Sequence, residues 1–352
     1  MLMSSNERVA TPTAIVAAKP LVEMADLTVK FVTRDATVSA INGVSLSLAP
    51  GESLCIIGES GSGKSVTMRA LMRLLPEGKT QISGRIEVAG NDILALSRRE
   101  LSRIRGSTIS MIFQEPMTVL DPVYSIGDQI AETVMRHEGC NRSKALDRAL
   151  ELLTLVRIPS PERRLKAYPH ELSGGLRQRA MIAMALSCRP SLLLADEPTT
   201  ALDATVQIQV LILLRDLQRQ MGMGLIFVTH DLGVAAQIAD KVAVMYAGRL
   251  VETGKAADVL LRPAHPYTQG MLASTVNGQD RNRDIETIPG SPPDLRRLPT
   301  GCGFAPRCRH ATIRCFKDTP PEIGVAAGRM ARCHFPHAPQ TLSDPAPTRN
   351  MQ

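Results

Sequence analysis

The sequence predicts an α/β fold in which short buried strands alternate with helices. Apolar runs at 53–57, 192–196 and 225–229 have the length and composition of strands that are covered on both faces. Apolar residues at helical spacing follow the first two runs, at 66–75 and 204–220. This alternation predicts a largely parallel sheet with helices packed on both of its faces.

Two regions of the chain depart from this alternation. β-Branched runs at 20–31 and 44–48 are separated by Gly, Asn and Asp turns, which predicts an antiparallel β-layer beside the main sheet. Apolar residues at helical spacing over 125–136 and 143–156 predict a small helical insertion at about 115–172. The chain is therefore expected to combine a parallel sheet, an antiparallel layer and a helical insertion.

Composition and charge limit the possible organisation of the 352 residues. The chain is long enough for one large domain and a smaller one, which we expect at 21–262 and 263–336. Residues 1–20 and 337–352 are expected to form a flexible lead-in and a disordered tail. No apolar run is long enough to cross a bilayer. The net charge of +7 permits contact with anionic lipid or nucleic acid, although a solvated basic surface is the simpler interpretation, and the aromatic content of 3% argues mildly against base stacking.

The strongest motif is a glycine-rich loop between a predicted strand and a predicted helix. It fits the pattern of Gly, four residues, then Gly-Lys-Ser, and its members are Gly58, Glu59, Ser60, Gly61, Ser62, Gly63, Lys64 and Ser65. Backbone N–H groups of such a loop can surround the β- and γ-phosphates of a nucleotide, and the helix N-terminus adds positive charge. Lys64 would neutralise phosphate oxygens and Ser65 would ligate Mg²⁺. The alternative is a turn that binds nothing, but the flanking strand and helix favour a nucleotide site.

Two acids, Asp196 and Glu197, end the buried run that begins at Leu192. Asp196 could orient a water of the Mg²⁺ shell, and Glu197 could polarise the attacking water. The alternative is a strand end with two solvated acids. Because the glycine-rich loop is also present, we favour the catalytic interpretation.

A second anion site is predicted at Ser173-Gly174-Gly175, which begins a helical pattern. Ser173 could cap that helix, whose unpaired N–H groups and dipole would face an anion. Alone, this motif would be an ordinary helix start.

Together the motifs resemble the ATP-binding subunit of ABC transporters over about residues 21–335. Six elements occur in the order of that family: GESGSGKS resembles the Walker A loop, Gln114 the Q-loop glutamine, LSGGLRQR the signature, LLLADEP Walker B, Thr200-Ala201-Leu202-Asp203 the D-loop, and His230 the switch histidine. The resemblance implies a P-loop NTPase cassette with a RecA-like parallel core. A small Cys-rich C-terminal extension follows it.

The resemblance also implies ATP and Mg²⁺ as cofactors. It places Ser65, Gln114 and Asp196 at Mg²⁺, and it gives catalytic roles to Glu197, His230 and Gln114. Further nucleotide contacts are implied at Phe31, Ser173, Gly174, Gly175, Gln178 and Asp203. Phe31 stands where the family stacks an aromatic ring on adenine, but a core Phe on a strand would give the same pattern.

The implied mechanism is an ATP sandwich in which two cassettes face head to tail. The Walker A loop of one cassette and the segment 173–175 of the other would then close on the same γ-phosphate, so that hydrolysis is coupled to closure. Gln114 would transmit this change to the helical insertion, which grips the membrane subunits.

The segments 114–122 and 265–268 resemble the ATPase subunits of dipeptide and oligopeptide importers, whose relatives also move nickel or glutathione. The implied partners are a related but different ATPase chain, two transmembrane permease subunits and an extracytoplasmic solute-binding protein. The chain would then be a peripheral protein on the cytoplasmic face of the bacterial inner membrane, with no nucleic acid bound. The alternative of another class is a soluble ABC ATPase that acts on nucleic acid or ribosomes.

Four cysteines, Cys302, Cys308, Cys315 and Cys333, are gathered in the extension. Their gaps are irregular and do not match the short gaps of common zinc ribbons, whereas four thiolates flanked by prolines suit a 4Fe–4S cluster. Some members of the importer subfamily are similar in carrying one. The sequence therefore favours a 4Fe–4S cluster, with free thiols and, less favoured, a zinc site as alternatives.

Overall fold

The computed structural model describes residues 19–199, 202–229, 231–274 and 287–336. Its main sheet has eight strands, in the order β11 (Glu322–Ala326), β12 (Arg329–Arg332), β10 (Arg249–Lys255), β9 (Lys241–Tyr246), β3 (Ser53–Ile57), β8 (Gly224–Val228), β7 (Leu192–Asp196) and β6 (Ile109–Ile112). Strands β9, β3, β8, β7 and β6 are parallel, and β10, β12 and β11 continue the sheet in antiparallel fashion. The predicted parallel core is confirmed.

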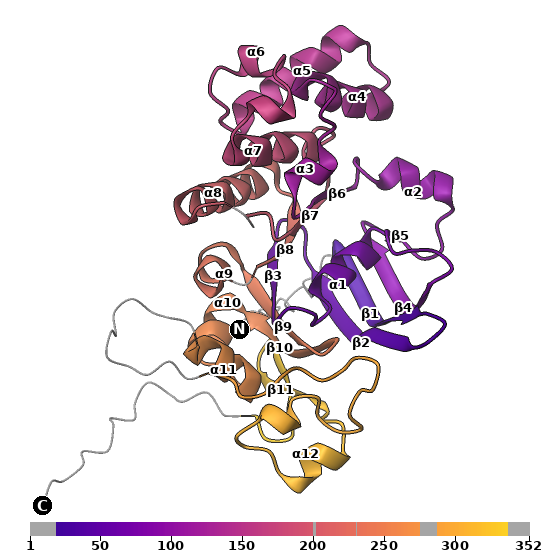
Figure 1. The fold of residues 1–352 in the computed structure, drawn as a ribbon, viewed down its shortest axis with the longest axis vertical. Coiled ribbons are helices and arrows are strands. Elements are labelled where there is room, and N and C mark those ends of the chain that lie inside the picture. The colour runs from indigo at the N-terminus through magenta and orange to yellow at the C-terminus, as the bar shows by residue number, and fades with distance from the viewer. Residues whose placement is uncertain (1–18, 200–201, 230, 275–286, 337–352) are drawn as a thin grey trace, which may run out of the picture.

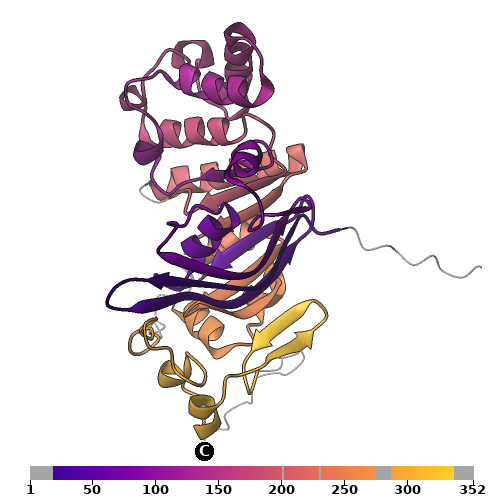
Figure 2. The ribbon, with the colours of Figure 1, turned by 90° about the vertical axis from the view of Figure 1, so that its right-hand side faces the viewer.

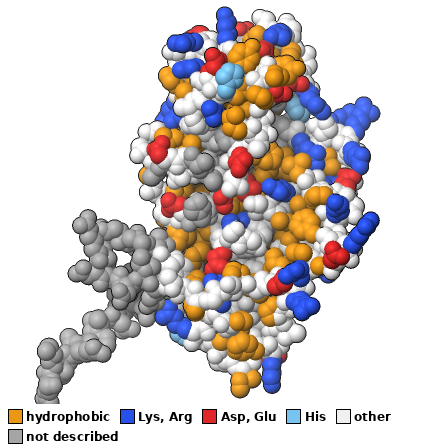
Figure 3. All heavy atoms as spheres, viewed as in Figure 1, with side chains coloured by type: hydrophobic (Ala, Val, Ile, Leu, Met, Phe, Trp, Pro, Cys, Tyr) orange, Lys and Arg blue, Asp and Glu red, His pale blue; other side chains and the backbone are white. Residues whose placement is uncertain are grey.

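The antiparallel layer is a separate four-stranded sheet, in the order β2 (Thr37–Leu48), β1 (Val22–Val32), β4 (Thr80–Val88) and β5 (Asn91–Asp92). Figure 2 shows this sheet crossing the strands of the main sheet, with the β11–β12 hairpin below it. In Figure 3, Lys and Arg side chains gather along the edge where this sheet and the nearby helix α2 lie, so part of the positive charge forms a basic edge.

Helices cover the main sheet and build the insertion. They are α1 (Lys64–Leu71), α2 (Arg98–Ile104), α3 (Pro116–Val119), α4 (Ile126–Glu138), α5 (Arg142–Leu155), α6 (Pro161–Arg164), α7 (Gly174–Ala185), α8 (Ala204–Met221), α9 (Leu232–Ile238), α10 (Ala256–Leu261), α11 (Pro266–Ala273) and α12 (Ile313–Lys317), with 3-10 turns at Pro169–Glu171 and Ala305–Arg307. Figure 1 shows α3 to α7 grouped at one end of the main sheet and α12 at the other. Among these helices, none combines the length and apolarity needed to cross a bilayer.

The helices of the insertion begin at side-chain caps that their sequences supply. Ser125 accepts a hydrogen bond from the Asp128 N–H at the start of α4, and Asn141 accepts one from the Lys144 N–H at the start of α5. Each cap satisfies a backbone donor that the helix leaves unpaired. Gly139, in the left-handed conformation, ends α4.

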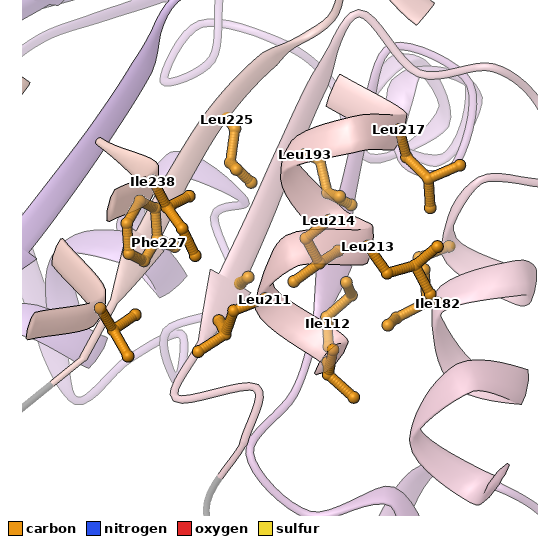
Figure 4. Close-up of a cluster of buried hydrophobic side chains, with 14 of the residues drawn as sticks. Ile112, Ile182, Leu193, Leu211, Leu213, Leu214, Leu217, Leu225, Phe227 and Ile238 are labelled. Atoms are coloured by element: carbon orange, nitrogen blue, oxygen red, sulfur yellow. The ribbon is translucent and has the colours of Figure 1, made fainter. Parts of the chain in front are cut away.

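The core of the fold is made of aliphatic side chains on both faces of the main sheet. Figure 4 shows Leu214 of α8 beside Leu193 of β7, and Leu213 beside Ile182 of α7, with Leu211 of α8 in the same cluster. Burial of such a side chain contributes roughly 1.5–3 kcal/mol, so α7 and α8 are held firmly on this face of the sheet.

The C-terminal extension contributes two strands to the main sheet, which the sequence did not predict. β12 pairs with β10 through Glu252↔Ala331 and Thr253↔Met330. The hairpin from β11 to β12 turns at Gly328, whose φ of 68° favours glycine. The short alternating runs on either side of this glycine were the available sequence signal. The domain boundaries at 262 and 336 stay predictions.

Candidate nucleotide-binding site

The glycine-rich loop joins the end of β3 to the start of α1. Gly58 and Gly63 have φ values of 152° and 108°. A Cβ atom at Gly58 would lie 2.2 Å from the Met245 carbonyl oxygen, and one at Gly63 would lie 2.7 Å from the Ala40 carbonyl oxygen. Only glycine therefore fits at both positions, and the backbone can curl as a phosphate-binding loop requires.

Lys64 is folded over this loop. Its Nζ donates hydrogen bonds to the carbonyl oxygens of Gly58 at 2.8 Å and Glu59 at 3.0 Å. Burial lowers the pKa of Lys64, while the carboxylates of Glu197 and Asp196 act in the opposite direction. The two carboxylates at the end of β7 thus favour the charged form of the Lys64 ammonium group.

Ser65 and Asp196 form the candidate Mg²⁺ site. Ser65 Oγ donates a hydrogen bond to Asp196 Oδ1 at 2.8 Å, although 131 residues separate them. Burial raises the pKa of Asp196, and the hydrogen bond from Ser65 opposes that rise. A hydroxyl and a carboxylate are oxygen ligands of the kind that Mg²⁺ prefers, so these residues fit the metal.

Gln114 and Glu197 meet at the ends of neighbouring parallel strands. Gln114 Nε2 donates a hydrogen bond to Glu197 Oε2 at 3.1 Å. The backbone N–H of Glu197 donates to the Val228 carbonyl oxygen at 3.2 Å, and its φ of 45° is in the left-handed region. A non-glycine residue in that region costs of order 1–3 kcal/mol and needs such support. The structure therefore holds Glu197 in an unusual orientation beside Gln114.

The segment 173–175 begins α7, in a different part of the molecule. Ser173 is the N-cap residue, but its side chain makes no capping hydrogen bond. A Cβ atom at Gly175 would lie 2.8 Å from Val206 Cγ1, which explains the glycine. Figure 1 shows α7 among the helices of the insertion and α1 beside the antiparallel layer. One chain thus does not bring Ser173 to its own phosphate-binding loop.

Three other residues predicted to contact the nucleotide lie in different parts of the fold. Phe31 on β1 is partly buried and packs against the core beneath the antiparallel layer, so adenine stacking stays a prediction. Gln178 is 2% exposed on α7, and its Nε2 has no hydrogen-bond partner among the residues that the structure describes. Asp203 caps α8 by accepting a hydrogen bond from the Val206 N–H. Their nucleotide contacts stay predictions.

His230, and Thr200 and Ala201 of the predicted D-loop, lie outside the residues that the structure describes. Their roles stay predictions.

The prediction of a 4Fe–4S cluster is wrong. Within the described ranges, no group of three or more His, Cys, Asp or Glu residues could hold a metal ion. Burial raises the pKa of Cys302 and Cys308 and raises that of Cys333 to about 11. The same finding leaves the zinc alternative without support. Spacing along the chain had suggested a ligand set that the fold does not provide.

Known protein families match the chain in both the cassette and the C-terminal extension. The ABC transporter family matches residues 41–200, and the family described as the oligopeptide/dipeptide transporter C-terminal region matches residues 251–315. The oligopeptide transport ATP-binding protein OppD of Salmonella typhimurium is 49% identical over 319 residues, which are 91% of this chain and 95% of the relative. OppD of Escherichia coli is 47% identical over 334 residues, covering 95% and 98%.

A solved structure resembles the cassette part. It is a dimeric, post-hydrolysis state of the ATP-binding cassette MJ0796 bound to ADP and Pi, with a TM-score of 0.60 and 28% identity, and it matches 67% of this chain and 98% of that one. The fold, the glycine-rich loop and the two acids at the end of β7 agree with this similarity to an ATP-binding cassette. The chain therefore belongs to the ATP-binding subunits of ABC transporters, in the group that carries the oligopeptide/dipeptide transporter C-terminal region.

Proposed function

We propose that this chain is the ATP-hydrolysing subunit of an ABC-type importer of dipeptides and oligopeptides. The observation that carries the proposal is the meeting of four side chains at the phosphate-binding loop, where Ser65 contacts Asp196 and Gln114 contacts Glu197. The peptide cargo is proposed because relatives such as the two OppD proteins are named for oligopeptide transport.

The residues of the site divide the chemistry between them. The loop backbone and Lys64 bind and orient the triphosphate, and Ser65, Asp196 and Gln114 would hold Mg²⁺, which supplies charge that stabilises the transferring phosphoryl group. Glu197 accepts the proton of the attacking water, and Gln114 fixes the direction of the Glu197 carboxylate. His230 would contact the γ-phosphate.

A second cassette completes each site in this proposal. Ser173 begins α7 away from its own loop, and its side chain is not used for capping. Its hydroxyl and the N–H groups at the start of α7 would bind the γ-phosphate held by the partner. Closure of the pair would then assemble the catalytic site and couple hydrolysis to import.

The exposed loop after Gln114 is proposed to dock on the permease subunits at the cytoplasmic face of the membrane. Met117, Val123 and Tyr124 are 50%, 70% and 57% exposed, and all three lie between Gln114 and α4. Met117 belongs to the short helix α3, and Val123 and Tyr124 follow it. Exposed apolar side chains grouped in one segment mark a surface for a protein partner. Gln114 lies two residues after the end of β6 and directly precedes this segment, so a movement of the permease would reach Gln114 directly.

Purification of the tagged chain from detergent-solubilised membranes tests the proposal. We expect two permease subunits and a second ATPase chain to co-purify, and we expect the ATPase rate of this complex to rise when a peptide-loaded binding protein is added. Val123→Asp with Tyr124→Asp should release the permease, whereas the matched control Phe316→Asp, at an exposed apolar residue of α12, should not. Recovery of nucleic acid that survives high salt, without permease, would contradict peptide import.

A further inference from the structure

Glu59 places an acidic side chain in the loop that is proposed to hold a triphosphate. Its Oε2 pairs with Nη1 of Arg307 at 2.8 Å, across 248 residues of sequence. Arg307 belongs to the 3-10 turn of the C-terminal extension, and its side chain is only 7% exposed. A buried guanidinium from outside the cassette motifs thus neutralises an acid beside the phosphate site.

Arg307 is held in one orientation by further contacts. Its Nε donates to the Pro289 carbonyl oxygen at 2.8 Å, and its Nη1 also donates to Tyr246 Oη at 3.2 Å. The Arg307 Cζ atom lies 5.8 Å from the centroid of the Tyr246 ring, within the range of a cation–π contact. The guanidinium is therefore a fixed charge rather than a mobile surface one.

The backbone of Glu59 is held as firmly as its carboxylate. Its N–H donates to Tyr267 Oη at 2.9 Å, and its carbonyl oxygen accepts from Lys64 Nζ at 3.0 Å. Tyr267 is fully buried on α11, and burial raises its pKa, so the ring stays a neutral phenol. Arg307, Tyr267 and Lys64 thus contact one carboxylate oxygen, the backbone N–H and the carbonyl oxygen of Glu59.

The extension also contacts strand β2 of the antiparallel layer. The Ser39 N–H on β2 donates to the Leu295 carbonyl oxygen at 3.0 Å. Ser39 pairs with Lys30, the neighbour of Phe31, in the register of β1 and β2. The extension therefore touches both the phosphate-binding loop and the hairpin that carries the predicted adenine contact.

We propose that Arg307 is a positioning residue of the nucleotide site, which screens the Glu59 carboxylate from the triphosphate and fixes the second residue of the loop. The proposal rests on the proposed function, because it needs Gly58–Ser65 to be the phosphate site. Without Arg307, the Glu59 carboxylate would repel the bound phosphates, and the repulsion would grow with the number of phosphate charges. A purely structural role for Arg307 would weaken ATP and ADP binding equally.

Nucleotide binding to the full-length chain, measured by isothermal titration with Mg–ATP and Mg–ADP, tests this. We expect Arg307→Met to raise the Kd for ATP about tenfold and that for ADP by about threefold. Glu59→Gln should bind ATP more tightly than wild type, because a negative charge is lost. The double variant should return to within about twofold of wild type. The control Arg314→Met, at an exposed arginine of the same extension, should leave both constants unchanged.

The proposal would be overturned if Arg307→Met lost ATP and ADP affinity equally and the added Glu59→Gln change did not restore it. Wild-type ATP affinity in Arg307→Met would also overturn it. Should Arg307→Met fold poorly, Arg307→Lys keeps the charge and is expected to keep most of the ATP affinity, and its loss would count against charge screening. Lys64→Ala separates the two hypotheses. Wild-type ATP binding in Lys64→Ala would reject the phosphate site itself, whereas loss there with no effect of Arg307→Met would reject only the role of Arg307.

Discussion

The Gln114 side-chain amide lies 3.1 Å from the Glu197 carboxylate, although 83 residues separate them in sequence. The strands that precede them, β6 and β7, are parallel neighbours with Ile112 opposite Ala195. Both side chains therefore emerge at the same edge of the sheet. Because α3 begins two residues after Gln114, the proposed permease-docking loop and the proposed base are linked through one amide.

Glu197→Gln is expected to bind ATP but not to turn it over. The amide keeps the shape of the side chain and its distance from Gln114, but it cannot accept the proton of the attacking water. Loss of a general base typically lowers a rate by about 10²–10⁴-fold. Phosphate release by the purified complex measures this, with ATP binding measured alongside. The control Glu132→Gln, at an exposed acid of α4, should hydrolyse ATP normally, and normal turnover in Glu197→Gln would reject the base assignment.

Ser173→Ala is expected to spare nucleotide binding and impair hydrolysis. Ser173 is remote from the loop of its own chain, so the Kd of the isolated chain for Mg–ATP should not change. Loss of one preorganised donor to the transferring phosphoryl group would lower the ATPase rate of the assembled pair by about 10²-fold. Weaker ATP binding by the isolated Ser173→Ala chain would contradict a role in trans.

The local parts of the site were predictable from sequence because neighbouring residues determine them. A buried strand, three glycines at positive φ and a helix beginning at Lys64 form the phosphate loop from consecutive residues of the chain. The acids at the end of β7 were predictable for the same reason, since a strand end exposes its next residues at the sheet edge.

Long-range contacts were not predictable from the sequence pattern. The pair of Arg307 with Glu59, and the addition of β12 to β10, depend on how the extension folds back on the cassette. The prediction of a 4Fe–4S cluster at the four cysteines was wrong for the same reason. Spacing along the chain does not determine the arrangement of sulfur atoms in space. Motif order could identify the cassette, but only the packing shows what the extension contacts.

Arg329→Met is expected to destabilise the protein strongly. The Arg329 guanidinium pairs with Glu252 Oε1 at 2.8 Å, and both side chains are almost completely buried. Glu252 also accepts hydrogen bonds from the backbone N–H groups of Ala264 and His265, at 2.9 Å each. Removal of one partner leaves a buried charge unpaired, which costs about 3–5 kcal/mol.

Urea unfolding of the purified chain measures the effect of Arg329→Met. The control Arg314→Met breaks an exposed pair with Asp318 and should cost less than about 1 kcal/mol. A loss in Arg329→Met as small as that of the control would show that the β11–β12 hairpin is not part of the cooperative fold.

His265 is expected to make the protein less stable in acid. It lies completely buried at the start of α11, where its Nδ1 accepts a hydrogen bond from the Tyr267 N–H at 3.0 Å. Burial lowers the pKa of His265 from 6.5 to about 3, against a weaker effect of a backbone hydrogen bond with Arg332. Below pH 6.5 the His265 imidazole therefore binds a proton in the unfolded chain but not in the folded chain. Stability from this group is complete above pH 6.5 and falls by about 1.4 kcal/mol per pH unit until pH nears 3.

The variant His265→Asn tests this slope, because Asn can still cap α11 but does not titrate. Urea unfolding at pH 7.5, 6.5 and 5.5 should show wild type losing about 1 kcal/mol more than the variant between the last two values, because the unfolded imidazole is already half protonated at pH 6.5. The control His170→Asn, at an exposed histidine of the 3-10 turn Pro169–Glu171, should follow wild type. Equal slopes for wild type and His265→Asn would mean that the imidazole gains its proton without unfolding, and that the packing around α11 opens to water in the folded protein.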